Sequence, residues 1–286
     1  MNMSERSFDL VVREIVKWSL AEDIGTGDAT TNSTIPEKAS ARAIILCKED
    51  GILAGIPVAN ETFRQVDHNS QITFDYSDGD RIKKGKRIAE LSGSARGILT
   101  AERTALNFLQ RLSGIATITA QFRDAVKGTK AKITDTRKTT PGLRVLEKYA
   151  VRCGGGINHR MGLYDMILIK DNHIAACGSI TNAVKAAKET QRGLKIEVEC
   201  KSIKDVKEVI GLSDIDRVMF DNMSVDNIEQ AVKIVNSRIE TEASGGVNLK
   251  TVREIALAGV DYISVGYITH SARALDISLE IVSMEG

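Results

Sequence analysis

The pattern of apolar and polar residues changes twice along the chain. Residues 8–23 carry apolar side chains at helical spacing after a Ser7 N-cap, which predicts an amphipathic helix. Residues 22–31 lose this periodicity and contain two glycines, so we expect a loop there. From about residue 40 to residue 99, short β-like runs alternate with glycines and predict a small antiparallel sheet. A long helix is predicted from about residue 100 to residue 126.

Each of these two helices is expected to bury one apolar stripe. The stripe of the first helix is formed by Leu10, Val11, Ile15 and Trp18. The stripe of the long helix is formed by Leu106, Leu109, Leu112 and Ile115. Arg103 lies off the second stripe, so by pattern alone it is a solvent-exposed charge.

After residue 130 the pattern becomes a series of β-like runs, each followed by a helical segment. The six runs span 131–136, 165–171, 195–200, 217–222, 239–244 and 261–266. From the third run onward the spacing is that of βα units, which predicts a parallel sheet. Six units are fewer than the eight of a complete α/β barrel, so we favour an incomplete α/β barrel over a doubly wound open sheet. Residues 274–282 are predicted to form a final helix.

Composition excludes several classes of protein. The 286 residues include 39 Lys or Arg and 38 Asp or Glu, a balance that gives no global field for nucleic acid or a membrane surface. The sequence has no apolar run of membrane-spanning length and no signal-peptide pattern, so we expect a cytoplasmic protein. The cysteines lack the close spacing of a zinc or redox motif and are interpreted as free thiols: Cys47, Cys153, Cys177 and Cys200.

Positive charge is concentrated in one stretch. Residues 136–173 contain seven Lys or Arg against three acidic residues, although the whole chain carries a net charge of only +1. The basic residues are Arg137, Lys138, Arg144, Lys148, Arg152, Arg160 and Lys170. This local excess predicts a small, highly anionic ligand.

Barrel enzymes place their chemistry at the carboxyl ends of the strands, and every predicted strand here ends in a candidate. A cationic group suited to carboxylates or phosphates comprises Arg137, Lys138, His159, Arg160 and Lys170. Glu199 and Asp221 end consecutive strands and are suitable oxygen ligands for Mg²⁺, or alternatively partners of neighbouring lysines. A candidate phosphate-binding group, which otherwise marks simple turns, comprises Ser244, Gly245, Gly246, Ser264 and Gly266.

The histidines differ in context. His159 follows a glycine run and precedes an arginine, which favours a role as acid, base or anion donor over that of a buried structural group. His68 and His270 have no such context, and His173 is interpreted as a loop or helix-cap residue.

Residues 78–93 also suggest a function from another class, because their paired turns between short strands resemble a lipoyl or biotinyl carrier domain. That interpretation requires a lysine in a characteristic context at a hairpin tip, and the segment lacks one.

Six ordered motifs resemble those of the quinolinate phosphoribosyltransferase family, also called nicotinate-nucleotide pyrophosphorylase (carboxylating). They are DTRKTTPG at 135–142, GGGINHR at 154–160, ILIKDNH at 167–173, IEVEC at 196–200, MFDNM at 219–223 and EASGGV at 242–247. Residues 102–117 are similar too. The resemblance implies an N-terminal α/β sandwich domain at 1–115 and an open α/β-barrel catalytic domain at 116–271, with a C-terminal helix at 272–286 that can pack on the first domain.

The resemblance also implies a reaction and roles for individual residues. Quinolinate and phosphoribosyl pyrophosphate would give nicotinate mononucleotide, pyrophosphate and CO₂ in de novo NAD biosynthesis. Arg103, Arg137, His159, Arg160 and Lys170 would bind quinolinate, and Lys138 and Lys170 would reach the phosphoribosyl donor. Glu199 and Asp221 would hold Mg²⁺, residues 244–246 with Gly266 would bind the 5′-phosphate, and Ser264 would also contact substrate. Lys138, Lys170, Glu199 and Asp221 would be catalytic.

The implied assembly is a homodimer, or an assembly of dimers, in which Arg103 crosses the interface into the partner's site. Arg144, Lys148 and Arg152 are then interpreted as helix-surface charges. Two related alternatives, a phosphoribosyltransferase for another ring acid and a paralogue linked to metal metabolism, should lack one or more quinolinate ligands. A non-catalytic phosphate-sugar binding barrel would keep residues 244–246 and lose Glu199 or Asp221.

Overall fold

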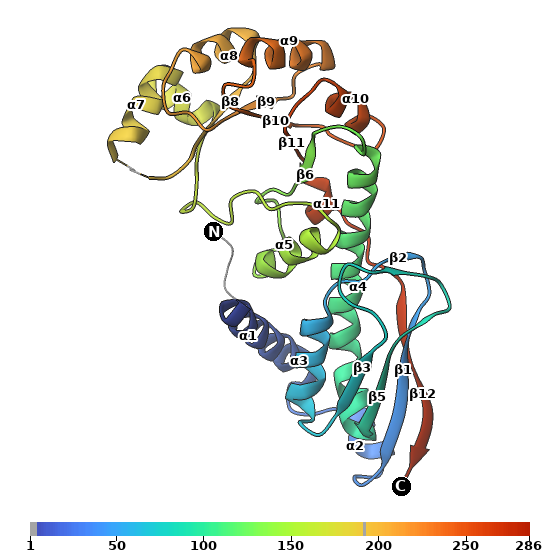
Figure 1. The fold of residues 1–286 in the computed structure, drawn as a ribbon. Coiled ribbons are helices and arrows are strands. Elements are labelled where there is room, and N and C mark those ends of the chain that lie inside the picture. Colours follow the sequence, from blue (N-terminus) through green and yellow to red (C-terminus); the bar gives the residue numbers. More distant parts are fainter. Residues whose placement is uncertain (1–4, 191–192) are drawn as a thin grey trace. The chain divides into compact units, whose positions relative to one another are not determined.

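The computed structural model describes residues 5–190 and 193–286 (Figure 1). The chain forms two compact units. The first comprises residues up to 120, 140–155 and 272–286, and the second comprises 121–139 and 156–271. Within the described residues, no helix combines the length and the apolar character required to span a bilayer.

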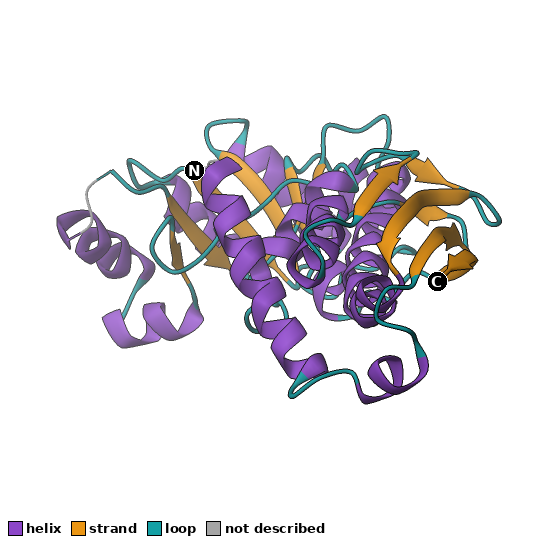
Figure 2. Ribbon diagram, turned by 90° about the horizontal axis from the view of Figure 1, so that it is seen from below, coloured by secondary structure: helices purple, strands orange, loops and turns teal. Residues whose placement is uncertain are grey.

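The first unit packs helices against a four-stranded antiparallel sheet with strand order β12-β1-β5-β3. The strands of this sheet are β1 (Ser40–Cys47), β3 (Gln71–Phe74), β5 (Arg87–Ser94) and β12 (Ile277–Glu285). Two short strands, β2 (Gly51–Ile52) and β4 (Arg81–Ile82), pair with each other in a separate antiparallel sheet. The helices of the first unit are α1 (Glu5–Ile24), α2 (Ala29–Thr34), α3 (Ile56–Val66), α5 (Arg144–Cys153) and most of α4 (Ala95–Ala125). Figure 2 shows the strands of the four-stranded sheet curving together near the C-terminus of the chain. Ile45, Leu91 and Leu106 are fully buried between sheet and helices.

The predicted first helix is present, but its predicted apolar face is wrong. Leu10 and Trp18 are 60% and 73% exposed, whereas Val12, Val16 and Leu20 are buried. Both sets of residues satisfy helical spacing, so sequence periodicity alone does not distinguish the buried stripe from the exposed one.

The predicted loop at 22–31 and the predicted final helix also need correction. Asp28 caps a short helix, α2, because its carboxylate accepts the Thr31 backbone N–H at 2.9 Å. Residues 277–285 form strand β12 instead of a helix, and β12 pairs antiparallel with β1. Its apolar residues Ile277, Leu279 and Ile281 also repeat every second position, so one side of the strand packs on the core of the first unit.

Helix α5 differs from its predicted surface role. Glu147 and Lys148 are fully buried, so the interpretation of Lys148 as a helix-surface charge is wrong. Glu147 accepts hydrogen bonds from Arg111 on α4, at 2.7 Å from Nη2, and from the Thr140 hydroxyl, also at 2.7 Å. The basic stretch therefore divides between a buried structural helix and the loops on either side of it.

The second unit is an open α/β barrel, as predicted. Its six parallel strands, in sheet order, are β6 (Lys132–Thr134), β11 (Tyr262–Ser264), β10 (Glu240–Ser244), β9 (Arg217–Asp221), β8 (Ile196–Cys200) and β7 (Ile167–Ile169). Strands β6 and β7 are the two edges of this sheet, so the barrel does not close. Its helices are α6 (Asp171–Cys177), α7 (Ile180–Thr190), α8 (Ile203–Ile210), α9 (Val225–Val235), α10 (Val252–Leu257) and α11 (Tyr267–His270). In Figure 1, α7, α8 and α9 lie along one side of the strands.

Alternation along these strands determines what faces the helices and what faces the barrel interior. Val198, Phe220 and Ile263 are fully buried, as expected for positions that pack against helices. Several of the alternate positions are charged, for example Glu197 and Glu199 on β8, although Met219 on β9 also lines the cavity side. Because successive side chains of a strand point to opposite faces, the two glutamates of β8 point to the same side at two different heights.

Candidate active site

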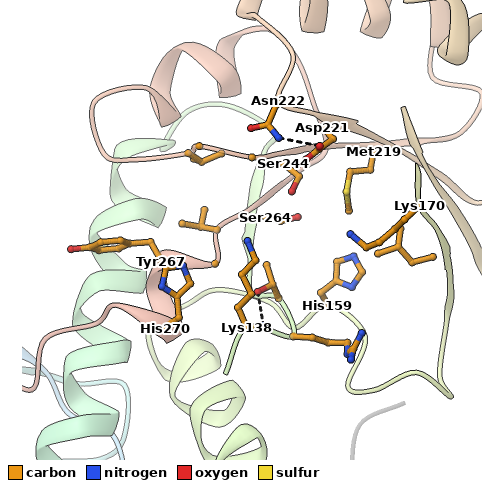
Figure 3. Close-up of a pocket in the computed structure, with 18 of the residues that line it drawn as sticks. Lys138, His159, Lys170, Met219, Asp221, Asn222, Ser244, Ser264, Tyr267 and His270 are labelled. Carbon is orange, nitrogen blue, oxygen red and sulfur yellow. Dashed lines mark hydrogen bonds between the residues drawn. The ribbon is translucent and has the colours of Figure 1, made fainter. Parts of the chain in front are cut away.

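A cavity of about 630 Å³ lies at the carboxyl ends of the barrel strands, where the sequence placed the chemistry (Figure 3). All of its lining residues belong to the second unit. The predicted site residues that line it are Arg137, Lys138, His159, Arg160, Lys170, Asp221, Ser244, Gly245, Gly246, Ser264 and Gly266.

Two predicted site residues are not in this lining. Glu199 is buried just behind it, and its Oε2 accepts a hydrogen bond from Lys170 Nζ at 2.8 Å. Arg103 belongs to the first unit, on α4, where its side chain is 62% exposed and lies 3.6 Å from Glu102. Its role as a ligand across an interface stays a prediction.

The cationic side of the cavity is held by the loop after β6 and by the segment after α5. The Lys138 carbonyl accepts the Thr269 hydroxyl at 2.8 Å, and Figure 3 shows the Lys138 amino group extending into the cavity. Arg160 Nη1 donates to the Met166 carbonyl at 3.0 Å. Burial lowers the pKa of Arg160, and the positive charge of Arg137 lowers it further. A bound dianion would relieve this repulsion, so the pair is suited to carboxylates.

The acidic side is formed by neighbouring strands. Glu199 on β8 and Asp221 at the end of β9 are inward-facing positions of paired strands. Asp221 Oδ2 accepts the Asn222 amide at 3.0 Å. Figure 3 shows Asp221 and Ser244 on the opposite side of the cavity from Lys138. These groups would meet the leaving group and the sugar of a phosphorylated substrate that spans the cavity.

Two glycines at this edge pack tightly against neighbouring side chains. Gly245 has φ +92°, and a Cβ there would lie 2.3 Å from Asn222 Oδ1. A Cβ at Gly266 would lie 3.0 Å from Lys138 Cδ. Both glycines therefore allow close packing of Asn222 and Lys138 at this edge of the cavity, and their role in binding a phosphate stays a prediction.

His159 is mostly buried, with 6% of its side chain exposed. Its Nε2 lies 2.9 Å from Glu197 Oε2, and its Nδ1 accepts the Arg160 backbone N–H at 2.7 Å. Burial raises the pKa of Glu197 and of Glu242, and for Glu242 the negative charge of Glu197 adds to the effect. Both ring nitrogens of His159 therefore have partners inside the protein. Its contact with a substrate carboxylate stays a prediction.

Sequence reasoning missed part of the lining and the layer beneath it. The missed lining residues are Thr136, Leu168, Met219, Asn222, Val247, Val265, Tyr267 and His270. Glu197 and Glu242 were missed although a signal was present, because a carboxylate at every second position of a buried strand must face the interior. His173 does act as a helix cap, since its Nδ1 accepts the Lys170 N–H at 2.9 Å.

Comparison with known families shows which family combines this fold with this site. The profile described as quinolinate phosphoribosyl transferase, N-terminal domain, matches residues 28–113. The profile for the C-terminal domain of the same family matches residues 115–280. The segment that resembles a carrier domain therefore lies within the match to the N-terminal domain of this family.

Individual relatives agree along nearly the whole chain. The sequence is 47% identical to a probable nicotinate-nucleotide pyrophosphorylase (carboxylating) of Bacillus subtilis (strain 168), over 95% of this chain and 94% of that protein. It is 46% identical to the chloroplastic nicotinate-nucleotide pyrophosphorylase (carboxylating) of Arabidopsis thaliana, over 97% of this chain and 84% of that protein. The structure of the nicotinate-nucleotide pyrophosphorylase from Francisella tularensis matches with a TM-score of 0.90 and 44% identity, over 96% of both chains. On this evidence the chain belongs to the quinolinate phosphoribosyltransferase family.

Proposed function

We propose that this protein transfers the phosphoribosyl group of phosphoribosyl pyrophosphate to quinolinate and decarboxylates the product. The products are nicotinate mononucleotide, pyrophosphate and CO₂, in a step of de novo NAD biosynthesis. The observation that carries this proposal is a cavity lined by arginines, lysines and the strand-end carboxylate Asp221, in a chain of this family.

The two sides of the cavity suit the two substrates. Quinolinate is a dianion, so Arg137, Arg160 and Lys170 supply the charges that its carboxylates require. Lys138 lies beside Gly266, where it can neutralise the phosphates of the donor. Gly245 and Gly246 line the same region, and their backbone is accessible to a 5′-phosphate.

The chemistry needs charge stabilisation and positioning more than a covalent nucleophile. Departure of pyrophosphate leaves a ribosyl centre with oxocarbenium character, which the Asp221 carboxylate can stabilise while Lys138 and Lys170 balance the leaving group. Once the pyridine nitrogen carries the ribose it is cationic. Its positive charge stabilises the electron pair that remains on the adjacent ring carbon when the carboxylate departs as CO₂, and a proton taken up by that carbon completes the product.

Glu199 and Asp221 fit a Mg²⁺ ion by their chemistry. They are hard oxygen donors on adjacent strands, and Mg²⁺ is commonly held by one or two carboxylates together with substrate phosphates. When bound, the ion would supply charge neutralisation on pyrophosphate. In this structure Lys170 Nζ donates a hydrogen bond to Glu199 Oε2 at 2.8 Å. Lys170 is suited to exchange this bond for one to a substrate, which would leave Glu199 available to the ion.

The direct test is an assay of the purified protein with Mg²⁺, phosphoribosyl pyrophosphate and quinolinate. We expect equal amounts of CO₂ and nicotinate mononucleotide, measured by release of labelled CO₂ and by chromatography. Nicotinate replaces quinolinate in the control, and equal turnover of nicotinate would contradict the proposed specificity. Addition of EDTA should abolish turnover and excess Mg²⁺ should restore it.

We further infer a homodimer in which Arg103 enters the site of the partner. Two observations support it: Arg103 is exposed on α4, and Leu10 and Trp18 form an exposed apolar stripe on α1. The test mixes R103A and K138A chains during refolding. Half of randomly mixed dimers are hybrids with one intact site of two, so roughly a quarter of wild-type activity should return.

The matched control for the hybrid test mixes K138A with K170A chains. Lys138 and Lys170 line the same cavity of one chain, so their hybrids contain no intact site and should stay inactive. Equal activity in the two mixtures would contradict the exchange of Arg103.

The cytoplasmic location stays a prediction, and the Arabidopsis relative is named as chloroplastic.

A further inference from the structure

A layer of buried charge lies beneath the active-site cavity and has no part in the chemistry described above. Glu197 and Glu242 are fully buried on β8 and β10, the two neighbours of β9 in the sheet. Each stands two residues before a residue of the site edge, Glu199 and Ser244 respectively. Because residues two apart on a strand face the same side, both carboxyl groups point into the barrel interior one layer deeper.

The His159 ring joins this layer to the cavity. Its Nε2 lies 2.9 Å from Glu197 Oε2 and 3.6 Å from Glu242 Oε2. Its Nδ1 accepts the backbone N–H of Arg160, and in a neutral ring this arrangement leaves the proton on Nε2, from which it is donated to Glu197. The ring therefore links the buried carboxyl layer directly to the main chain of a cavity arginine.

The carboxyl groups are themselves held in place. Arg217 Nη1 donates to Glu242 Oε2 at 2.8 Å, and the Ser264 hydroxyl donates to Glu242 Oε1. The main chain of His159 is held as well, because Asp135 Oδ1 accepts the His159 backbone N–H at 2.9 Å. The position of His159 is thus determined from its main chain and from its ring.

His159, Glu197 and Glu242 also offer a possible set of metal ligands, with ligand atoms within 4.8 Å of one another. Arg217 argues against that use, because its guanidinium is bonded to the same Glu242 oxygen that faces His159. A cation would meet a fixed positive charge there. The hydrogen-bonded arrangement accounts for the cluster without a metal.

One buried oxygen of Glu197, Oε1, lacks a hydrogen-bond partner among the described residues. An apolar residue would avoid this desolvation penalty, so stability alone does not explain a carboxylate at this position. The carboxylate is explained if its other oxygen is needed to orient His159.

We propose that Glu197 and Glu242 are positioning residues of the quinolinate site, which orient the His159 ring and through it the Arg160 main chain. This inference rests on the proposed function, since quinolinate is the ligand whose binding is affected. It separates two roles within the barrel: the outer layer of strand-end residues contacts substrates, and the buried carboxyl layer sets the geometry of the quinolinate side.

The test compares E197A, E197Q and a matched control, E240A. Glu240 also bonds Arg217, at 2.9 Å, and it lies one layer further from the cavity than Glu242. E197A should raise the KM for quinolinate on the order of tenfold with a much smaller change in kcat, because binding geometry is lost. E197Q keeps an oxygen that can accept from Nε2 and should restore most of the affinity. E240A should leave the KM for quinolinate unchanged.

A double-mutant cycle tests whether Glu197 acts through His159. In an H159A background, E197A should cause little further loss, because the residue through which it acts is absent. Equal losses in both backgrounds would overturn the proposal. So would a KM for quinolinate that responds equally to E197A and E240A. Absence of turnover in the wild-type protein would instead refute the proposed function, so the two failures are distinguishable.

A second measurement does not depend on the folding of any variant at position 197. The chain has four histidines, so the imidazole nitrogens of ¹⁵N-histidine-labelled wild-type protein can be resolved by NMR. The His159 signals are identified by their loss in H159N. We expect the tautomer with the proton on Nε2, and a proton on Nδ1 would overturn the proposed arrangement.

Discussion

The buried Glu147 on α5 offers the sharpest test of how the cationic loop is anchored. Its carboxylate accepts four hydrogen bonds: from Arg111 Nη2 at 2.7 Å, from Arg111 Nε at 3.1 Å, from the Thr140 hydroxyl at 2.7 Å and from the Thr140 N–H at 3.1 Å. The substitution E147Q removes the charge and one acceptor oxygen while it preserves the shape of the side chain. Arg111 and the loop that follows Lys138 then lose their common anchor.

The expected loss can be worked from the burial of the two partners. Removal of one partner of a buried ion pair costs about 3–5 kcal/mol. Arg111 is 27% exposed, so water can compensate part of this loss, and we expect the free energy of unfolding to fall by about 2–3 kcal/mol. Thr140 follows Lys138 by two residues, so loss of the Thr140 anchor should also disturb Lys138, which we propose contacts the phosphoribosyl donor. The KM for phosphoribosyl pyrophosphate should therefore rise as well.

The assay is equilibrium urea unfolding followed by circular dichroism at one fixed protein concentration. R111Q and the double variant R111Q/E147Q complete a cycle, and we expect a coupling energy of about 1–3 kcal/mol between the two side chains. An E147Q protein within about 0.5 kcal/mol of wild type, the range of an ordinary surface substitution, would refute the reasoning. Additive losses in the cycle would refute it equally.

Two further predictions concern the site edge and a loop beside it. G245A should raise the KM for phosphoribosyl pyrophosphate on the order of tenfold, because it adds a steric clash with Asn222 to an unfavourable φ. The control is G128A: Gly128 also has a positive φ (+84°), but a Cβ there would contact nothing, so that KM should stay unchanged. Asp165 is partly buried, which raises its pKa, but the backbone N–H bonds it accepts outweigh this and lower the pKa below its usual value. The ionised Asp165 should therefore stabilise the fold above about pH 4, and this stabilisation should be lost as pH falls through the lowered pKa. We expect D165N to lower the free energy of unfolding by roughly 1–2 kcal/mol at pH 7. The difference between wild type and D165N should disappear in acid. D9N, at an exposed position, serves as the control, and a gap that does not change with pH would contradict the assignment.

Much of the barrel could be predicted because its signals are local. Strands β7 and β9 are short, largely apolar runs with a polar residue at or just after the end, so Lys170 and Asp221 could be placed at strand ends without knowledge of the tertiary structure. Parallel strands bring those ends to one edge, and the cavity gathers them there.

The errors arise where two local patterns are equally good. Strand β12 contains apolar residues that fit both a helix and a strand, and the available edge of β1 decides between them. Helix α1 carries two apolar stripes, and tertiary packing selects the one that contains Val16. The burial of Lys148 depends on what packs over α5, which the local sequence does not contain.

The depth of a side chain in the barrel was also beyond the sequence pattern. Glu197 and Glu199 look alike in the motif IEVEC, yet one is bonded to a histidine inside the barrel and the other to a cavity lysine. Only the height of each residue along its strand separates these roles.

The pairing of β12 with β1 has a consequence for the order of events during synthesis. Strand β1 emerges from the ribosome early, but the neighbour that covers its edge and adds Ile277 to the core is translated after the whole of the second unit. The first unit must wait with an open sheet edge, a state in which strands readily pair with other chains. Nascent chains stalled before residue 272 should therefore depend on chaperones more strongly than chains released after β12 is complete.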